Sequence, residues 1–295
     1  MISLCVGVIA VMTAAGTNAP PALQTLVAQT NTWHQQRTAR LEAEDGWLTL
    51  VALDWLEEGP NPAGSAADAK VALPKSAPAQ LGTYTRHGKS VSFAPAKGVA
   101  VTLSGKPFPG GAVKTDEAGD PDVLKVGTLQ LLTIVRGDRV GVRVRDSASE
   151  VRRDFKGIDR FPVTTEWRKV AAWEPAKPGQ VEHIVNVLGD VEEEPLAGTA
   201  IFTHQGQAYR LEAVTEDGSL FFVFGDETNR DTSYPAGRFL TAALPKDGHV
   251  VLDFNRAYNP PCAFTRFATC PLPSRGNKLK LRIEAGEKRY GQPHE

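Results

Sequence analysis

The sequence lacks several features that would point directly to a reaction. Only three of its 295 residues are cysteine. The six histidines show no pair at helical spacing, and they are His34, His87, His183, His204, His249 and His294. A zinc site needs Cys or His ligands at characteristic spacings. A Gly-x-Ser-x-Gly nucleophile turn is also missing. The sequence therefore predicts no metal site, no cofactor and no serine hydrolase of that type.

An excess of positive charge is missing as well. Lys and Arg total 33 and Asp and Glu total 34, which leaves a net charge of -1. Nucleic-acid-binding proteins usually carry a basic balance or a basic stripe, so we expect no nucleic-acid partner. Hydrophobic residues at 41% and charged residues at 23% are typical of a globular protein. The length suffices for one large or two medium domains.

A short apolar segment opens the chain. Residues 1–16 (MISLCVGVIAVMTAAG) carry no charge and end in small residues, as a secretory signal peptide does. At roughly 15 residues, against about 20 for a membrane-spanning helix, the run is too short to cross a bilayer. We predict a signal peptide over residues 1–19 with an open cleavage position, export to the periplasm or outside the cell, and no transmembrane segment after processing. The alternative is a misassigned start or an apolar tail.

The expected compartment bears on the two remaining cysteines. After removal of the first residues, Cys262 and Cys270 are left. An even number of cysteines in an oxidising compartment favours a disulfide, which here would close a short loop.

The rest of the chain is predicted to be mostly β. One amphipathic helix is expected over residues 20–45, with Leu23, Leu26, Trp33, Arg37 and Leu41 on one face. Short apolar or alternating runs separated by Gly, Pro and Asp then predict antiparallel sheets. Among them, Leu220–Phe224 is apolar on both faces and is predicted to be a central strand. The expected strands include 47–55, 70–73, 82–86, 91–94, 99–103, 128–136, 139–145, 167–173, 183–188, 199–204, 207–214, 220–225, 238–243, 250–255 and 278–285.

The C-terminal part carries a long and specific motif. Residues 253–264 (DFNRAYNPPCAF), then 268–273 (ATCPLP), Asn277 and 285–288 (AGEK), resemble the signature of the bacterial family catalogued as domain of unknown function 1684. Blocks at 45–50, 141–146 and 237–240 resemble other parts of that family, so the resemblance spans roughly Trp33 to Tyr290. It implies a fold and a site region, and it implies no established activity.

A second resemblance concerns residues 59–107. Gly64-Ser65, the short run ending at Leu73-Pro74 and the Ser104-Gly105 turn are similar to a forkhead-associated (FHA) β-sandwich. The charged donors that a phosphate would need are missing, so we expect an FHA-like scaffold without phosphothreonine binding. The predicted domains are an FHA-like sandwich over 46–115 and a larger antiparallel β domain over 116–295.

Polar residues gather in two loops of the second domain and mark the candidate ligand site. Asp226, Thr228, Tyr234 and Arg238 lie near one strand end, and Asp253, Asn255 and Asn259 lie at another. If these strands are neighbours, the side chains converge, as in a small-molecule site. Arg238 would hold a carboxylate or phosphate, and Asp226 or Asp253 would act as a base. Alternatively, these residues cap turns and Arg238 pairs with Asp226.

Three functions stay open at this point. The first is an envelope or secreted protein that binds a small polar or anionic ligand, or a peptide. The second is a cofactor-free hydrolase or lyase with an Asp base and an Arg clamp. The third is a structural β module. Arg143, Arg145 and Asp146 are predicted to form a surface ladder or cross-strand ion pairs.

Overall fold

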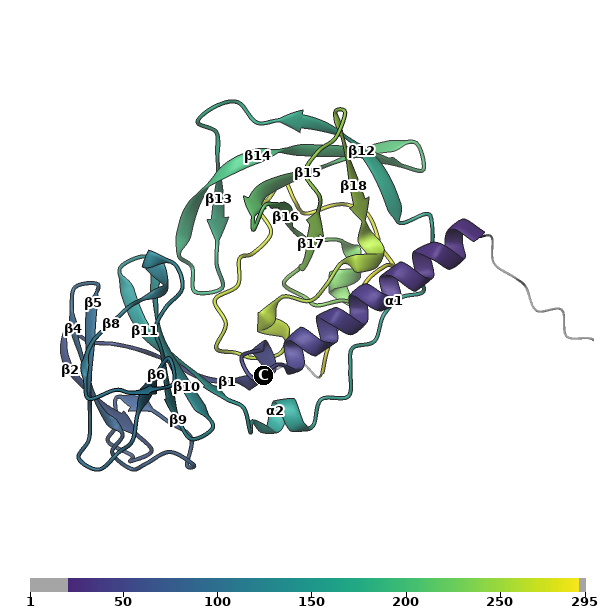
Figure 1. Ribbon diagram of the computed structural model, residues 1–295. Helices are drawn as coiled ribbons and strands as arrows, with labels where there is room; N and C mark the ends of the chain where they lie inside the picture. Colours follow the sequence, from purple (N-terminus) through teal and green to yellow (C-terminus); the bar gives the residue numbers. More distant parts are fainter. Residues whose placement is uncertain (1–20, 292–295) are drawn as a thin grey trace, which may run out of the picture.

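The structure, a computed structural model, describes residues 21–291. The predicted signal peptide, residues 1–19, lies outside the described residues. The mostly β fold with one long N-terminal helix is confirmed (Figure 1). Within residues 21–291, no helix is long and apolar enough to cross a membrane.

Helix α1 (Pro21–Glu42) begins with a proline, which a first helical turn tolerates. Leu26 and Leu41 are buried on its inner face. The chain turns sharply after the helix, and a Cβ added at Gly46 would lie 2.3 Å from the carbonyl oxygen of Leu41. Only glycine fits there, which explains why the helix ends close to the predicted position. The helix lies diagonally across the second β unit (Figure 1).

Two stacked sheets form the N-terminal β-sandwich (Figure 1). A five-stranded sheet has the order β3-β2-β4-β5-β8, and a six-stranded sheet has the order β1-β11-β10-β9-β6-β7. The elements are η1 (Trp47–Thr49), β1 (Leu50–Trp55), β2 (Gly59–Gly64), β3 (Val71–Ala72), β4 (Gly82–His87), β5 (Ser90–Pro95), β6 (Thr102–Leu103), β7 (Lys106–Pro107), β8 (Gly111–Val113), η2 (Asp116–Ala118), β9 (Val123–Val126), β10 (Leu129–Arg136) and β11 (Arg139–Asp146).

The expected boundary at residue 115 falls inside this sandwich. β9, β10 and β11 lie beyond it, yet β11 pairs with both β1 and β10. Val140, Val142 and Val144 are fully buried in the same core as Tyr84 and Phe93. One sheet and one core therefore extend across the expected boundary.

The second β unit is a curled seven-stranded sheet in the order β17-β16-β15-β14-β12-β18, with β13 paired to β14 (Figure 1). Its two end strands approach one another, which gives the sheet the shape of a partly open barrel. A short helix, α2 (Glu150–Arg153), precedes it. The elements are β12 (Arg168–Pro175), β13 (Val181–Val185), β14 (Val191–His204), β15 (Gln207–Glu216), β16 (Ser219–Phe224), η3 (Glu227–Arg230), β17 (Arg238–Ala242), β18 (His249–Asp253), η4 (Phe254–Arg256) and η5 (Pro261–Ala263).

Strand β16 is buried on both faces, as predicted. Phe222 and Phe224 point into the main core of the second unit. Phe221 and Val223 point the other way, into a second cluster that contains Cys270. Full burial of an aromatic side chain stabilises a fold by roughly 1.5–3 kcal/mol, so this strand anchors two clusters at once.

Residues 278–285 do not form the predicted strand. Their alternation still places Leu279, Leu281, Ile283 and Ala285 in the main core. Their backbone groups bond mainly to loops and side chains, as when Leu279 N donates to Gly225 O at 2.8 Å. The period-two pattern identified the buried face correctly, but no strand ladder forms along it.

The outer face of the six-stranded sheet lies against the second unit. Ile134 points out of the sandwich by strand alternation, yet it is fully buried. Arg136 Nε donates to Thr269 Oγ1 at 3.2 Å. Thr265 Oγ1 donates to the Leu50 carbonyl at 3.0 Å. These contacts bring β11 next to residues 262–270.

Candidate functional site

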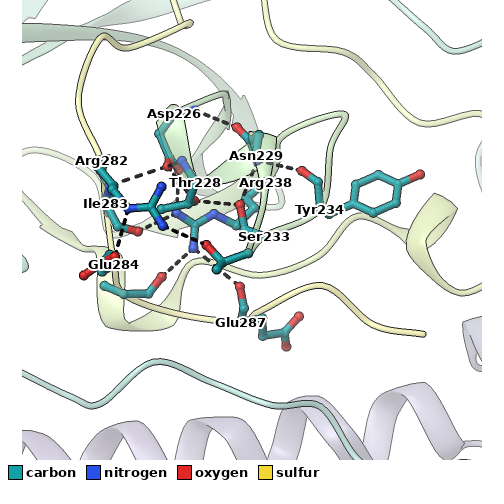
Figure 2. A network of polar contacts seen from close by, with 12 residues as sticks. Asp226, Thr228, Asn229, Ser233, Tyr234, Arg238, Arg282, Ile283, Glu284 and Glu287 are labelled. Atoms are coloured by element: carbon teal, nitrogen blue, oxygen red, sulfur yellow. Dashed lines mark hydrogen bonds and ion pairs between the residues drawn. The ribbon is translucent and has the colours of Figure 1, made fainter. Parts of the chain in front are cut away.

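Arg238 lies in the interior of the second unit, at the start of β17 (Figure 2). Its side chain is fully buried. One terminal nitrogen donates to Asp226 Oδ2 at 2.5 Å and to the Ile283 carbonyl at 2.9 Å. The other donates to the carbonyls of Ala285 and Glu287. The guanidinium therefore binds the chain's own C-terminal segment, and it has no face open to a ligand.

Asp226 caps the short helix η3 with its side chain. Its Oδ1 accepts hydrogen bonds from Thr228 N at 2.7 Å and from Thr228 Oγ1 at 2.6 Å. Asn229 Nδ2 donates to the carbonyl of Tyr234 at 2.6 Å and to Ser233 (Figure 2). Short polar side chains bond nearby backbone groups in this way wherever a turn must be fixed. The side chain of Asp226 is fully buried, so it offers no base to a substrate.

The second predicted loop also bonds to the chain itself. Asp253 Oδ1 accepts from Asn255 N at 3.2 Å. The Asn255 side chain accepts from Thr164 N at 3.0 Å and donates to Thr164 O at 2.9 Å. Asn259 Nδ2 donates to the Lys288 carbonyl at 2.8 Å. The side-chain amides of Asn255 and Asn259 thus bond backbone groups of segments that have no regular secondary structure.

The two loops do converge, and they meet at Glu287. Its Oε2 accepts from Asn259 N at 2.7 Å, and its main-chain carbonyl accepts from Arg238. Arg37 of α1 pairs with Oε1 at 3.3 Å. Burial raises the pKa of Glu287 above its ordinary value, although the charge of Arg37 opposes this shift. Arg238 and Asn259, one from each loop, therefore both bond Glu287, within a buried network that joins the C-terminal segment to the barrel. The expectation of an open, anion-holding Arg238 is wrong for this geometry.

An open groove lies beside this network, between α1 and the second unit. It has a volume of about 600 Å³. We call it the α1 groove, and its lining is Trp33, Gln36, Arg37, Arg40, Leu41, Ala43, Asp45, Gly46, Trp47, Thr241 and Tyr258.

Aromatic and cationic side chains alternate along the α1 groove. The Trp33 and Tyr258 rings lie 6.1 Å apart, and the Arg37 guanidinium lies 4.6 Å from the Tyr258 ring centre. Trp33, Arg37 and Arg40 share one face of α1 because they are four and three residues apart. Arg40 is exposed and makes no hydrogen bond or ion pair to residues 21–291. The groove thus combines flat apolar walls with one free positive charge.

The ionisable groups next to the groove are poor proton carriers near neutral pH. Burial raises the pKa of Tyr258, so its phenol stays protonated. Burial, with the nearby charges of Arg160 and Arg37, lowers the pKa of His34 to about 4, so its imidazole stays neutral. These directions give no support to acid–base chemistry by Tyr258 or His34.

The sequence prediction missed the groove, although one signal was present. Arg37 interrupts the apolar stripe of the helix, at a position where an aliphatic residue would be expected. A charged residue in such a stripe indicates a buried or half-buried partner, which here is Glu287. Arg40 and Trp47 gave no comparable signal.

Cys262 and Cys270 are both free cysteines in this structure, so the disulfide between them stays a prediction. One further expectation differs from the structure. Arg143 is not part of a surface ladder, because it is only 6% exposed and contacts the Trp47 ring. Within residues 21–291, no three His, Cys, Asp or Glu residues gather as a metal site.

Comparison with known proteins supports the family resemblance for the second unit. Residues 153–288 match the family model described as "Protein of unknown function (DUF1684)". A similar solved structure is the solution NMR structure of an uncharacterized protein from gene locus rrnAC0354 of Haloarcula marismortui. It is 30% identical, covers 46% of this chain and 78% of that chain, and has a TM-score of 0.39. No curated protein matches the chain.

Proposed function

We propose that this protein, whose residues 153–288 match the DUF1684 family model, binds a small anionic ligand in the α1 groove. The single observation that supports this is the free Arg40 beside Trp33, Trp47 and Tyr258 in a groove of about 600 Å³. Ligand sites are commonly concave and mostly apolar, with a few polar groups that fix orientation. The ligand class that fits is an anion with a flat apolar part.

The charges near the groove support an anion over a cation. Arg37 and Arg40 line it, and Asp45 is the acidic residue among the lining side chains. Arg37 is already paired with Glu287, so its role is to hold Tyr258 in place through the cation–π contact. Arg40 is left to bind the anionic group, and a guanidinium suits carboxylates and phosphates equally well.

The test is a binding measurement with benzoate and phenyl phosphate as probes. Arg40→Ala is expected to weaken binding of the better probe about tenfold or more, because it removes a charge-assisted hydrogen bond worth roughly 1.5–3 kcal/mol. Arg275→Ala is the matched control, since Arg275 is also exposed but lies outside the groove. Equal affinities in both variants, or no binding of either probe, would contradict the proposal and favour a structural β module.

The hydrolase or lyase alternative has less support. Its clamp, Arg238, and one of its two candidate bases, Asp226, are fully buried and bonded to the chain. The other candidate base, Asp253, bonds Asn255 and lies near Arg256. None of the three faces the α1 groove.

We also propose that the chain, from a bacterial family, is exported. Support comes from the uncharged apolar segment 1–16 and from the even pair Cys262 and Cys270, which are close enough for Cys270 Sγ to accept from Cys262 N at 3.1 Å. In an oxidising compartment we expect these two thiols to form a disulfide. N-terminal sequencing of the mature protein should find a start after residue 16, and an intact Met1 on the exported form would contradict this.

The FHA-like character of residues 59–107 is proposed for the scaffold alone. The two stacked sheets and their shared core support it. Ala63 and Ala66 flank Gly64-Ser65, where a phosphate-binding relative needs charged donors. Titration with a phosphothreonine peptide should therefore show no binding.

A further inference from the structure

Cys262 and Cys270 form a pair of thiols with unequal exposure. Cys270 is 5% exposed, whereas Cys262 is half-buried and lines a pocket of about 320 Å³. Cys270 Sγ accepts a hydrogen bond from Cys262 N at 3.1 Å, and Cys262 Sγ lies 3.5 Å from the Ala268 carbonyl. One thiol therefore faces the pocket, and the other lies behind it within reach.

The Cys262 pocket shares no lining residue with the α1 groove, and Arg238 does not line it. Its walls are mostly apolar, with Tyr234, Ala263 and Tyr290 among them, and two arginines, Arg266 and Arg289, also line it. A small molecule or an extended peptide with an acidic group fits such a lining.

A buried cation lies near the thiols, because Trp47 packs in the same cluster as Cys262 and Cys270 and also contacts Arg143. Arg143, on β11, is 6% exposed, and its guanidinium lies 5.4 Å from the Trp47 ring. It makes no hydrogen bond or ion pair to residues 21–291, and its Nε is buried without a partner. Its neighbour Arg136 differs, because Asp116 pairs with it at 2.8 Å. A buried charge without a counter-charge is costly, so an anion close to Arg143 is favoured.

We propose that Cys262 and Cys270 form a thiol–disulfide exchange pair, in which Cys262 attacks from the pocket, Cys270 resolves, and Arg143 is a positioning residue that stabilises the Cys262 thiolate. This goes beyond ligand binding in the α1 groove. It also differs from a static disulfide, because the bond between the two cysteines forms and breaks as part of the reaction.

The reaction balances in two steps with a small-molecule or peptide disulfide as the oxidant. The Cys262 thiolate attacks one sulfur of that disulfide, forms a mixed disulfide and expels the other sulfur as a thiolate. The Cys270 thiol gives its proton to a leaving thiolate and attacks the Cys262 sulfur. The second substrate sulfur then leaves as a thiolate and takes up, from water, the proton that Cys262 released when it ionised. Two electrons pass to the substrate disulfide, which becomes two thiols, and the protein gains one disulfide.

The acidities of the two thiols agree with these roles. The hydrogen bond with Cys270 is the main cause that lowers the pKa of Cys262, and the charge of Arg143 adds to it. Burial raises the pKa of Cys270. Burial lowers the pKa of Arg143 to about 10, so its guanidinium stays charged at neutral pH. The attacking thiol in such a pair is the one with the larger thiolate fraction and the better access.

The first experiment uses oxidised glutathione on the full reduced protein, followed by mass spectrometry. The wild type is expected to form the Cys262–Cys270 disulfide and release two equivalents of glutathione. Cys270→Ser should trap glutathione on Cys262, and Cys262→Ser should trap far less. Dithiothreitol should reduce the wild-type bond under native conditions. No adduct on the Cys270→Ser variant, or a wild-type disulfide that resists dithiothreitol until the protein unfolds, would overturn the proposal.

The second experiment tests Arg143 through the pH profile of Cys262 alkylation by iodoacetamide. Arg143→Met is expected to slow alkylation about tenfold at neutral pH, and the difference should disappear at alkaline pH, where the thiol is ionised in both proteins. Arg143→Lys should retain most of the rate. Arg145→Met is the matched control, because Arg145 is the next residue on the same strand face. Equal slowing by both Met variants at every pH would overturn the role of Arg143.

Discussion

The interior of the second unit and the junction between the two units each contain a buried arginine in different surroundings. Arg238 is fully buried and bonds a carboxylate and three carbonyls (Figure 2). Arg143 is 6% exposed and faces an indole ring without any ion pair to residues 21–291. The chain pairs the Arg238 guanidinium with a carboxylate and leaves the Arg143 guanidinium without an ion pair to residues 21–291.

This difference separates a structural role from a chemical one. A buried charge that is fully paired has nothing left for a ligand, however suitable its residue type is. A buried charge without a partner is a source of electrostatic field for whichever group lies next to it. Arg143 contacts Trp47, which packs in one cluster with Cys262 and Cys270, so the groups that we propose feel its charge are these two thiols.

Replacement of Arg238, the arginine with an ion pair, should cause the largest loss of stability. Arg238→Met leaves Asp226 buried with an uncompensated charge and frees the carbonyls of Ile283 and Ala285. We expect the free energy of unfolding to fall by about 3–5 kcal/mol, the usual cost of breaking a buried ion pair. Urea denaturation followed by tryptophan fluorescence measures this change.

An exposed arginine nearby provides the control for this effect. Arg282 pairs with Asp231 at 3.0 Å on the surface of the same segment. Arg282→Ala should change stability little, because exposed ion pairs are screened by water and salt. Similar losses in the two variants would mean that the buried network does not join the C-terminal segment to the barrel.

The sequence could predict which residues near Arg238 are buried, but not which hydrogen-bond partners their backbone groups have. The alternation of Leu279, Leu281, Ile283 and Ala285 correctly predicted a buried face. The same pattern suggested a strand, because it does not reveal that the Ile283 and Ala285 carbonyls bond a side chain. Strand β2 was missed for a different reason. Its sequence, GPNPAG, is poor in strand formers, and its pairing with β4 determines its conformation.

A smaller loss of stability is expected for a substitution at Asn255, in the second predicted loop. Asn255 is 2% exposed and bonds both the N–H and the carbonyl of Thr164. Asn255→Ala leaves these two backbone groups without their partner, so we expect a loss of about 1–3 kcal/mol in the free energy of unfolding. Gln35→Ala, at an exposed amide on α1 that bonds none of residues 21–291, should stay within about 0.5 kcal/mol of the wild type. Equal values for the two variants would contradict the structural role of Asn255.

Glu287 should make the stability of this network depend on pH. Burial raises its pKa in the folded protein above the ordinary value of 4.5. The folded state then holds the proton more tightly than the unfolded state. Its contribution to stability is therefore present below pH 4.5 and is lost as the pH rises through the folded pKa. Glu287→Gln has no proton to lose, so the wild type should lose stability relative to this variant as the pH rises. Parallel curves in urea denaturation across that window would contradict the prediction.

The sequence could not predict the surroundings of Arg143, because a different part of the chain covers it. The alternation in β11 correctly placed Arg143 and Arg145 on the face opposite the valines. That face seemed exposed because a strand pattern carries no information on which distant segment packs against it. Here, the Trp47 ring lies beside Arg143, and the contact between Arg136 and Thr269 brings residues 262–270 close to the same sheet.

The smallest effect on stability is expected for Arg143→Met, the counterpart of Arg238→Met. Methionine keeps much of the side-chain volume and removes a buried charge that has no partner among residues 21–291. Because no bond is broken, we expect the free energy of unfolding of the reduced protein to stay within about 1 kcal/mol of the wild type, or to rise. Urea denaturation in the presence of dithiothreitol measures it. A loss as large as that of Arg238→Met would show that the two arginines have the same structural role.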